Sequence, residues 1–289
     1  MTQVLDQLTQ LLTLEEIEAG LYRGQSQDLG FPQVFGGQVI GQALAAAKQT
    51  VDVSRRVHSF HSYFLLPGDA NRPIVYDVEV IRDGRSYSTR RIKAIQYGKP
   101  IFYMTASFHQ EEPGFDHQAE MPNVAAPEKL ESQQEFAQRH LHLLPEAIRD
   151  RYACEMPIEM RSATPFNPLQ PEKMEAVRDV WFRANGKLAD DPRIHMYLLA
   201  YASDFNFLPT AAQPHGVSFM QPNIQMATID HSMWFHRDFR MDDWLLYHVD
   251  SPSSGGGRAV VRGQFFDRQG RLVASTMQEG VFRDKQNRK

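Results

Sequence analysis

Apolar and polar residues follow two different periods along this chain, one typical of helices and one typical of strands. The stretch from Phe35 to Gln49 is rich in small and apolar residues and holds no proline, which predicts a buried helix entered through Gly36 and Gly37. Four stretches rich in β-branched and aromatic residues follow, separated by turn signals that each contain glycine, and they predict antiparallel strands. These stretches are residues 57–66, 73–81, 86–97 and 99–110.

The second half of the chain repeats this order. Residues 179–186 predict a strand, and residues 191–209 predict a mostly apolar helix that is opened by a proline. The strands predicted after this helix are residues 224–237, 243–251, 258–267 and 271–283.

Two further features indicate that the halves are copies of one unit. The dipeptide His-Ser occurs at residues 61–62 and 231–232, at like places in the first strand after each helix, and Gly98 and Gly270 mark like turns. A long apolar helix followed by an antiparallel meander, present twice, is accommodated if each sheet wraps around its own helix and the two sheets join edge to edge or face to face. The predicted class is therefore α+β, in a double hot-dog arrangement.

The remaining segments complete the predicted organisation. Thr13 and Glu16 have the spacing of a capping box, which predicts a short helix ending at Gly20. Residues 113–127 are rich in proline and alanine and predict a linker, and residues 128–150 predict a helix. We expect an N-terminal unit at residues 1–112, a linker and connecting helix at 113–150, and a C-terminal unit at 151–289.

Composition and charge narrow the classes of function. With 289 residues, 42% of them hydrophobic, the chain can bury a large core, and its one cysteine, Cys154, excludes an internal disulfide and is expected to be a small buried residue. The net charge of −4 and the pI near 6.3 give no sign of a nucleic-acid-binding surface. No stretch reaches the roughly 18 apolar residues of a membrane span, and the N-terminus has no secretory pattern, so we expect a soluble protein of the reducing cytoplasm.

Three polar residues interrupt apolar stretches and are candidates for chemistry. Asp204 lies in the predicted second helix among aromatic and apolar neighbours, where a carboxylate is either a hydrogen-bonded structural group or a base with a shifted pKa. Thr228 and Gln278 lie in predicted strands, where each alone is more often an ordinary structural residue. The histidines near the two equivalent strands lack metal-ligand spacing, so we expect paired or core histidines and no metal site; they are His58, His61, His231 and His236.

Several catalytic motifs do not occur in the sequence. It holds no G-x-S-x-G turn for a serine nucleophile, no H-E-x-x-H for zinc, no phosphate-binding G-x-x-x-x-G-K and no C-x-x-C. The glycine run at residues 255–257 lies between predicted strands and indicates a hairpin. Serine α/β-hydrolase, zinc hydrolase, nucleotide-cleaving and thiol redox chemistry are therefore not supported.

Long stretches of the sequence resemble the bacterial acyl-CoA thioesterase II family and its peroxisomal relatives. The stretches that carry the resemblance are LYRGQSQDLGFPQVFGGQVIGQAL, VHSFHSYFLLPGD, DGRSYSTRR, GKPIFYMTASF, YASDFNFL, ATIDHSMWFHR and VASTMQEGVFR. The resemblance implies a double hot-dog fold, a fatty acyl-CoA substrate, no cofactor and a homo-oligomer, either a dimer or a tetramer. It also implies a catalytic set of Asp204 on the second helix, Thr228 on the following strand and Gln278 on the last strand.

The implied chemistry is attack of a water molecule on the thioester. Asp204 would deprotonate the water, while Thr228 and Gln278 fix its position. The backbone N–H groups at Gly36 and Gly37 are our candidates to line the site and to stabilise the charge on the carbonyl oxygen.

The two halves differ in the residues that they offer to a site. If they are aligned on their His-Ser dipeptides, His58 matches Thr228, and the first helix has no carboxylate where the second has Asp204. We therefore expect one active site per chain, with His58 lining it from the first half. Two other functions stay open at this point: an enoyl-CoA hydratase or dehydratase, which would use His58 with an acidic partner, and a non-catalytic acyl-CoA-binding module.

Overall fold

The computed structural model of the chain describes residues 2–30, 33–143, 149, 154–164 and 166–287. The elements of the first half are α1 (Gln3–Leu11), β1 (Glu15–Glu18), β2 (Leu21–Gly24), α2 (Gly36–Gln49), β3 (Arg56–Phe64), β4 (Ile74–Asp83), β5 (Tyr87–Gln96) and β6 (Lys99–His109). The connecting segment holds η1 (Pro127–Lys129), α3 (Gln133–Arg139) and η2 (Leu141–Leu143). The elements of the second half are β7 (Ile158–Ser162), β8 (Val177–Ala184), α5 (Pro192–Ala202), η3 (Leu208–His215), β9 (Ile224–Thr228), β10 (Asp230–Phe235), β11 (Leu245–Gly255), β12 (Arg258–Asp267), β13 (Leu272–Asp284) and η4 (Lys285–Asn287).

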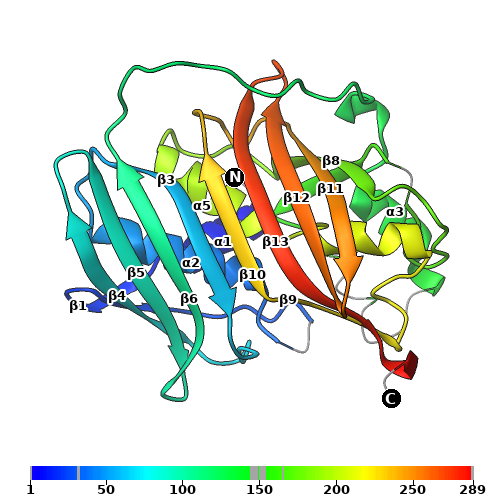
Figure 1. Ribbon diagram of the computed structural model, residues 1–289, viewed down its shortest axis with the longest axis horizontal. Coiled ribbons are helices and arrows are strands. Elements are labelled where there is room, and N and C mark those ends of the chain that lie inside the picture. The colour runs from blue at the N-terminus through cyan, green and yellow to red at the C-terminus, as the bar shows by residue number, and fades with distance from the viewer. Residues whose placement is uncertain (1, 31–32, 144–148, 150–153, 165, 288–289) are drawn as a thin grey trace.

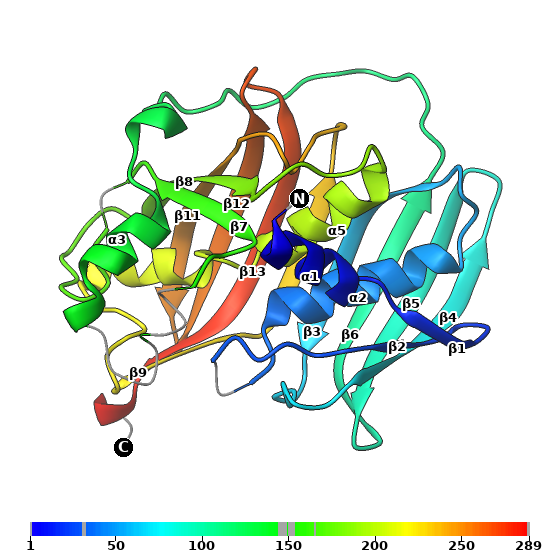
Figure 2. The ribbon, with the colours of Figure 1, turned by 180° about the vertical axis from the view of Figure 1, so that it is seen from behind.

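The strands form one continuous antiparallel sheet with the order β1-β2-β4-β5-β6-β3-β10-β13-β12-β11-β8-β7, and β9 also pairs with β13. The two halves join edge to edge, where β3 pairs with β10. The helices α2 and α5 lie on one face of this sheet, behind it in the view of Figure 1 and in front of it in Figure 2. Two meanders, each with its own apolar helix, confirm the predicted double hot-dog fold.

The two central helices pack closely because α2 carries glycine where they meet. A Cβ added at Gly37 would lie 2.1 Å from the backbone oxygen of Tyr201, and one added at Gly41 would lie 3.3 Å from the backbone oxygen of Tyr197. The predicted helix entered through glycine is thus confirmed, and these glycines let the backbones approach each other. This contact sets the N-terminal end of α2 beside the C-terminal end of α5.

The junction between β3 and β10 corrects the alignment of the two halves. His231 pairs with Ser62, and Ser232 pairs with His61, so the two dipeptides are neighbours in space. Ser62 and His231 are buried, whereas His61 is exposed. A two-fold relation between the halves must bring buried positions onto buried positions, so the dipeptides are not equivalent, because a shift of one residue exchanges the faces of a strand.

The glycine turns give the correct alignment. Gly98 and Gly270 both have positive φ, 70° and 78°, and both link the last two strands of a meander. Following the strand registers from these turns brings Phe60 onto the position of His231 and Val57 onto the position of Thr228.

Two predicted helices differ from the structure. Thr13 does not begin a helix: its hydroxyl donates to a backbone carbonyl at the end of α1, and the chain continues into the β1–β2 hairpin, turned by Gly20 with a φ of 82°. The predicted helix over 128–150 is represented by α3, which begins with a capping box, and by short 3₁₀ turns. Residues 144–148 and 150 of that prediction lie outside the described residues.

The strand predicted over residues 224–237 is interrupted at Ile229. The Ile229 N–H donates to the carbonyl of Glu279, and its own carbonyl accepts from the N–H of Phe64, both at 2.9 Å. The interruption separates β9 from β10, and only β10 continues beside β3. Thr228 is therefore the last residue of β9, at the point where the two halves of the sheet meet.

Candidate active site

Asp204 does not lie on the second central helix, as predicted, but in the turn that follows it. The helix α5 ends at Ala202, and Asn206 then takes a left-handed conformation with a φ of 58° before η3 begins. Asparagine adopts this conformation more readily than most residues. The turn brings the Asp204 carboxylate to the N-terminus of α2 and to the wall of a cavity.

The N-terminus of α2 provides the first partner of this carboxylate. The N-cap residue of α2, Phe35, makes no capping hydrogen bond through its side chain. The Asp204 carboxylate instead accepts a hydrogen bond from the backbone N–H of Gly37. The free N–H groups and the dipole of a helix N-terminus both favour an anion. A Cβ added at Gly36 would lie 2.7 Å from Asp204 Oδ2. Of the two predicted glycines, Gly36 lines the cavity and Gly37 holds the carboxylate.

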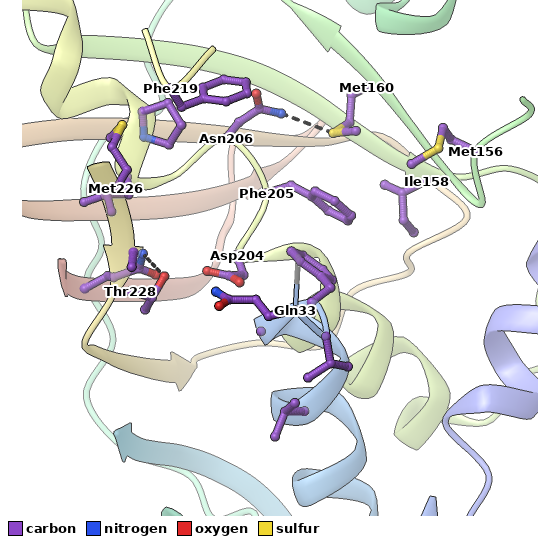
Figure 3. A pocket seen from close by; sticks show the side chains of 18 of the residues that line it. Gln33, Met156, Ile158, Met160, Asp204, Phe205, Asn206, Phe219, Met226 and Thr228 are labelled. Atoms are coloured by element: carbon purple, nitrogen blue, oxygen red, sulfur yellow. Dashed lines mark hydrogen bonds between the residues drawn. The ribbon is translucent and has the colours of Figure 1, made fainter. Parts of the chain in front are cut away.

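Thr228 and Gln278 complete the polar set. The Thr228 hydroxyl donates to the Asp204 carboxylate, and Gln278 Nε2–H donates to Thr228 Oγ1 at 2.9 Å. Gln278 lies on β13 and is only 1% exposed. Figure 3 shows Asp204 and Thr228 facing each other beside the cavity. The structure thus brings the three predicted side chains together in one hydrogen-bonded chain.

The environment of Asp204 changes its acidity. Burial raises the pKa of Asp204 to about 6, while the hydrogen bonds donated by Gly37 and Thr228 act in the opposite direction. Desolvation is therefore the larger effect. A carboxylate with this pKa is mostly ionised at neutral pH and accepts a proton far more readily than an exposed aspartate, which suits a general base.

The cavity beside Asp204 has a volume of about 1090 Å³. Its wall combines apolar side chains from both halves of the chain with a smaller polar group on and near α3. Figure 3 shows the methionine and phenylalanine side chains arranged around the space next to the carboxylate. The apolar lining includes Phe64, Met156, Ile158, Met160, Phe205, Phe219 and Met226, and the polar lining includes Gln134, Glu135, Gln138 and Arg161. Such a cavity suits a ligand with a long apolar part and a polar part.

Two neighbours of the site, His231 and Gln33, were not predicted from the sequence to belong to it. His231 is fully buried; its Nδ1 lies 2.7 Å from Gln278 Oε1, and its Nε2 lies 3.0 Å from Ser203 Oγ. Gln33 lines the cavity, and its side chain reaches toward the carboxylate in Figure 3. The alternation of β10, in which His231 shares the buried face with apolar residues, is a signal that identifies it. No pattern in the sequence distinguishes Gln33.

The prediction that His58 lines the site is corrected by the structure. His58 lies near the start of β3, with Nε2 2.8 Å from Ser107 Oγ and its ring against Tyr87 and His109. Because β3 and β10 are antiparallel, the start of β3 lies at the opposite end of this strand pair from Thr228. His58 is not among the residues that line the cavity. Cys154, expected to be buried, is exposed.

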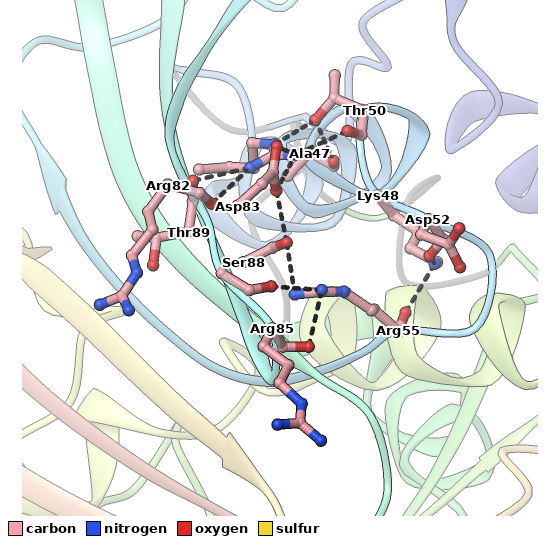
Figure 4. Close-up of polar contacts among 12 residues, drawn as sticks. Ala47, Lys48, Thr50, Asp52, Arg55, Arg82, Asp83, Arg85, Ser88 and Thr89 are labelled. Carbon is pink, nitrogen blue, oxygen red and sulfur yellow. Dashed lines mark hydrogen bonds and ion pairs between the residues drawn. The ribbon is translucent and has the colours of Figure 1, made fainter.

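The corresponding place at the other end of the two helices is built differently. The residue two positions beyond α2, which matches Asp204, is Val51. The Lys48 ammonium donates to three backbone carbonyls of the following turn at 2.7 to 3.3 Å. Nearby, the buried guanidinium of Arg90 binds Asp83 and Thr50, which ties the end of α2 to the β4–β5 hairpin (Figure 4). These contacts stabilise the helix end and provide no base.

Among the described residues, no three or more His, Cys, Asp or Glu side chains gather in a way that could hold a metal ion. Within the same part of the chain, no helix is long and apolar enough to cross a membrane.

The fold and the site together define a class: a double hot-dog protein with a buried carboxylate, a hydroxyl and an amide at one end of its central helices. The family model described as acyl-CoA thioesterase matches residues 147–281, and the model described as acyl-CoA thioesterase N-terminal domain matches residues 25–109. This chain therefore belongs to the acyl-CoA thioesterase family, whose members are thioester hydrolases.

Individual relatives match over nearly the whole chain. Acyl-CoA thioesterase 2 of Haemophilus influenzae is 46% identical over 283 residues, which cover 98% of this chain and 99% of the relative. Human acyl-coenzyme A thioesterase 8 is 40% identical, over 96% of this chain and 89% of the relative. The crystal structure of an acyl-CoA thioesterase II from Mycobacterium marinum matches with a TM-score of 0.79 at 40% identity, over 96% of this chain and 98% of the other.

Proposed function

We propose that this protein hydrolyses fatty acyl-CoA to a free fatty acid and coenzyme A, with a water molecule activated by Asp204, Thr228 and Gln278. The observation that carries the proposal is the position of Asp204. It combines a pKa of about 6 with a place on the wall of a large, mostly apolar cavity, and it is hydrogen-bonded to Thr228. The similar proteins described above are each named as acyl-CoA thioesterases, which supports the same substrate.

The reaction needs no nucleophile from the protein. Water attacks the thioester carbonyl carbon, and its proton passes to Asp204 as the new C–O bond forms. The tetrahedral intermediate then collapses, the C–S bond breaks, and the coenzyme A thiolate leaves and takes up the proton that Asp204 had accepted, which restores the carboxylate. Because Gly37 donates its N–H to Asp204, the N–H at Gly36 is the candidate in this pair for contact with the carbonyl oxygen.

The first test is release of free thiol from a saturated acyl-CoA. We expect the protein to release one thiol per substrate, and Asp204→Asn to lower kcat by at least about 10², because the amide cannot take the proton. A hydratase would release no thiol from this substrate, and a binding module would bind it without turnover. Activity of Asp204→Asn within threefold of the unchanged protein would contradict the assignment.

Asp230→Asn is the matched control for this substitution. Asp230 lies at the start of β10, and its carboxylate accepts a hydrogen bond from the N–H of Glu279 at 2.7 Å. It is not among the residues that line the cavity. We expect Asp230→Asn to keep kcat, so that a loss confined to Asp204→Asn reports on the site rather than on the fold.

A second test separates water attack from covalent catalysis. In ¹⁸O-water under single-turnover conditions, direct attack by water places label in the first fatty acid released. If Asp204 instead formed an anhydride that water opened at the Asp204 carbonyl, the first acid would be unlabelled and the label would stay on the enzyme. An ester on Thr228 would appear as an added acyl mass in rapidly quenched protein, and we expect no such mass.

We also propose that the protein works in the cytoplasm as a homo-oligomer, either a dimer or a tetramer. The outer face of the sheet exposes large side chains, among them Tyr63, Tyr87 and Met277, which are each more than 40% exposed. Exposed apolar residues in such number are typical of a surface that another chain covers. Light scattering at micromolar concentration should give two or four times the chain mass of 33.2 kDa, and a mass of 33.2 kDa would contradict the proposal.

A further inference from the structure

The buried histidine His231 contacts the proposed catalytic set from behind. It lies on β10, on the buried face of the sheet, and is 0% exposed. Its Nδ1 is 2.7 Å from Gln278 Oε1, and Gln278 Nε2–H donates to Thr228 at 2.9 Å. His231 does not line the cavity. It therefore reaches the reacting water only through Gln278 and Thr228.

We propose that His231 is a positioning residue, whose Nδ1–H fixes the orientation of the Gln278 amide and thereby directs the Thr228 hydroxyl to Asp204. This inference rests on the proposed function and adds a residue that the mechanism above does not use. It assigns to His231 a defined tautomer, with hydrogen on Nδ1.

The hydrogen-bond chain has two possible directions, and only one serves Asp204. With hydrogen on Nδ1, His231 donates to Gln278 Oε1, the amide presents its N–H to Thr228, and the hydroxyl hydrogen of Thr228 is left for Asp204. With hydrogen on Nε2, Nδ1 becomes an acceptor and the amide must turn its NH₂ toward His231. Gln278 Oε1 would then take the Thr228 hydroxyl, and Asp204 would lose that donor.

The other side of His231 is compatible with the productive direction. The Ser203 hydroxyl donates to the backbone oxygen of Ala200 at 2.8 Å, and Ser203 Oγ lies 3.0 Å from His231 Nε2. When Nδ1 carries the hydrogen, the one hydrogen of Ser203 must turn from Ala200 to Nε2, a rotation that both distances allow. Burial lowers the pKa of His231 to about 4, so the ring is neutral at neutral pH and one of its nitrogens is an acceptor. Phe60 and Phe207 enclose the ring.

The proposal makes two kinetic predictions for His231→Phe, which keeps an aromatic ring and removes the donor. We expect kcat to fall about 10-fold or more with KM nearly unchanged, since the Thr228 hydroxyl is no longer held on Asp204. We also expect the acid limb of the kcat/KM profile to move up by about half a pH unit or more, because the Thr228 hydrogen bond lowers the pKa of Asp204. In a Thr228→Ala background, His231→Phe should add less than about twofold, because both changes remove the same contact.

Replacement of His231 by each of two amide side chains distinguishes a positioning role of this residue from a packing role. His231→Asn places an amide N–H where Nδ1–H stands, whereas His231→Gln reaches toward the place of Nε2 and Ser203. We expect His231→Asn to recover most of kcat and His231→Gln to recover little. Equal activity of the two variants would overturn the proposal.

His195→Phe is the matched control. His195 is also buried, at 3% exposed, and its Nδ1 accepts from the N–H of Met241 at 3.0 Å, but it lies on α5 and does not line the cavity. We expect this variant to lose stability and to keep both kcat and the acid limb. If His231→Phe does no more than His195→Phe, the proposal is wrong.

A measurement on the unchanged protein covers the case in which His231→Phe does not fold. The ¹⁵N shifts of the His231 ring at neutral pH should show hydrogen on Nδ1, and hydrogen on Nε2 would overturn the proposal. Its failure is distinguishable from failure of the proposed function: if Asp204→Asn abolishes thiol release while His231 has the Nε2–H tautomer, only the role of His231 is lost.

Discussion

At the scale of the residue, Asp204 occupies a position that costs the folded state stability. Its pKa of about 6 lies above the ordinary 3.8, so the folded protein holds a proton there more tightly than the unfolded chain does. The stabilising contribution of this group is present at acid pH and is lost as the pH rises through about 6. From the difference between the two pKa values, the ionised carboxylate costs about 3 kcal/mol above that pH.

This cost predicts that Asp204→Asn stabilises the protein while it inactivates it. We expect a higher free energy of unfolding than the unchanged protein at pH 7.5, and a difference that shrinks toward pH 4.5, where both side chains are uncharged. Urea unfolding at the two pH values measures it. A variant that is less stable at both would show that the hydrogen bonds to Gly37 and Thr228 outweigh the cost of burial.

The same pKa predicts the pH dependence of the reaction. A general base acts in its ionised form, so kcat/KM should fall about tenfold for each pH unit well below 6 and should be level above it. The titratable groups near Asp204 include His231, whose pKa is lowered, and Tyr247, whose pKa is raised, so both are uncharged around that pH. A profile with its acid limb near pH 4 would contradict the environment described for Asp204.

Residue types at the site could be predicted from the sequence, but their surroundings could not. Asp204, Thr228 and Gln278 interrupt apolar stretches, and the resemblance to a family added their roles. The prediction that His58 lines the site is wrong because β3 and β10 are antiparallel, so the residue of β3 that matches Thr228 lies at the opposite end of the strand pair from Thr228 itself. The sequence predicts His231 only as a paired or core histidine, since its contact with Gln278 depends on strand pairing across the sheet.

At the scale of the element, the crossing of α2 and α5 depends on a glycine. A Cβ at Gly37 would lie 2.1 Å from the Tyr201 backbone oxygen, a contact that no side-chain movement relieves. We expect Gly37→Ala to lower the free energy of unfolding by more than about 2 kcal/mol and to reduce thiol release, because the helix end that holds Asp204 must shift. Gly114→Ala is the control: nothing lies within 4 Å of its added Cβ, so its effect should stay within about 0.5 kcal/mol.

Elements with a strong period were predictable, and short elements held by distant partners were not. The helix α2 and strands β3 to β6 follow their sequence patterns. The strands β1, β2 and β7 were missed: β1 is exposed along its whole length, so it has no alternation of buried and exposed residues to read. The position of Asp204 in a turn rather than on the helix depends on Asn206, whose left-handed conformation a helical period does not reveal.

At the scale of the whole molecule, the two ends of the helix pair predict one catalytic site per chain. Asp204 stands at one end, and Val51 stands at the matching place of the other, where Lys48 closes the helix with three backbone carbonyls. Titration with a tight, slowly hydrolysed acyl-CoA analogue should give one equivalent per chain. Two equivalents, with half the activity surviving Asp204→Asn, would contradict this asymmetry.

The path of the chain between the halves predicts that the chain can be cleaved there without loss of assembly or activity. Residues 110–126 contain no helix or strand, whereas β3 and β10 hold the halves together across the sheet. A protease site inserted at Gly114 should give a nicked protein that stays assembled and active. Either fragment isolated in denaturant and refolded alone should be inactive, because Gly37 and Asp204 lie on different fragments. Loss of activity on nicking alone would contradict this prediction.

The junction between β3 and β10, which joins two halves of one chain, has a consequence for which amino-acid substitutions such a protein can accept. In an assembly of two identical chains related by a two-fold axis, every substitution appears twice, so a residue good for catalysis at one end is forced on the other end as well. Here the two ends of the helix pair are encoded separately. Lys48 and Arg90 can secure one end of the helix pair while the other carries a buried carboxylate that weakens it, and neither change has to be repeated. Because both halves belong to one chain, stability at one end of the helix pair and chemistry at the other can be adjusted independently within a single fold.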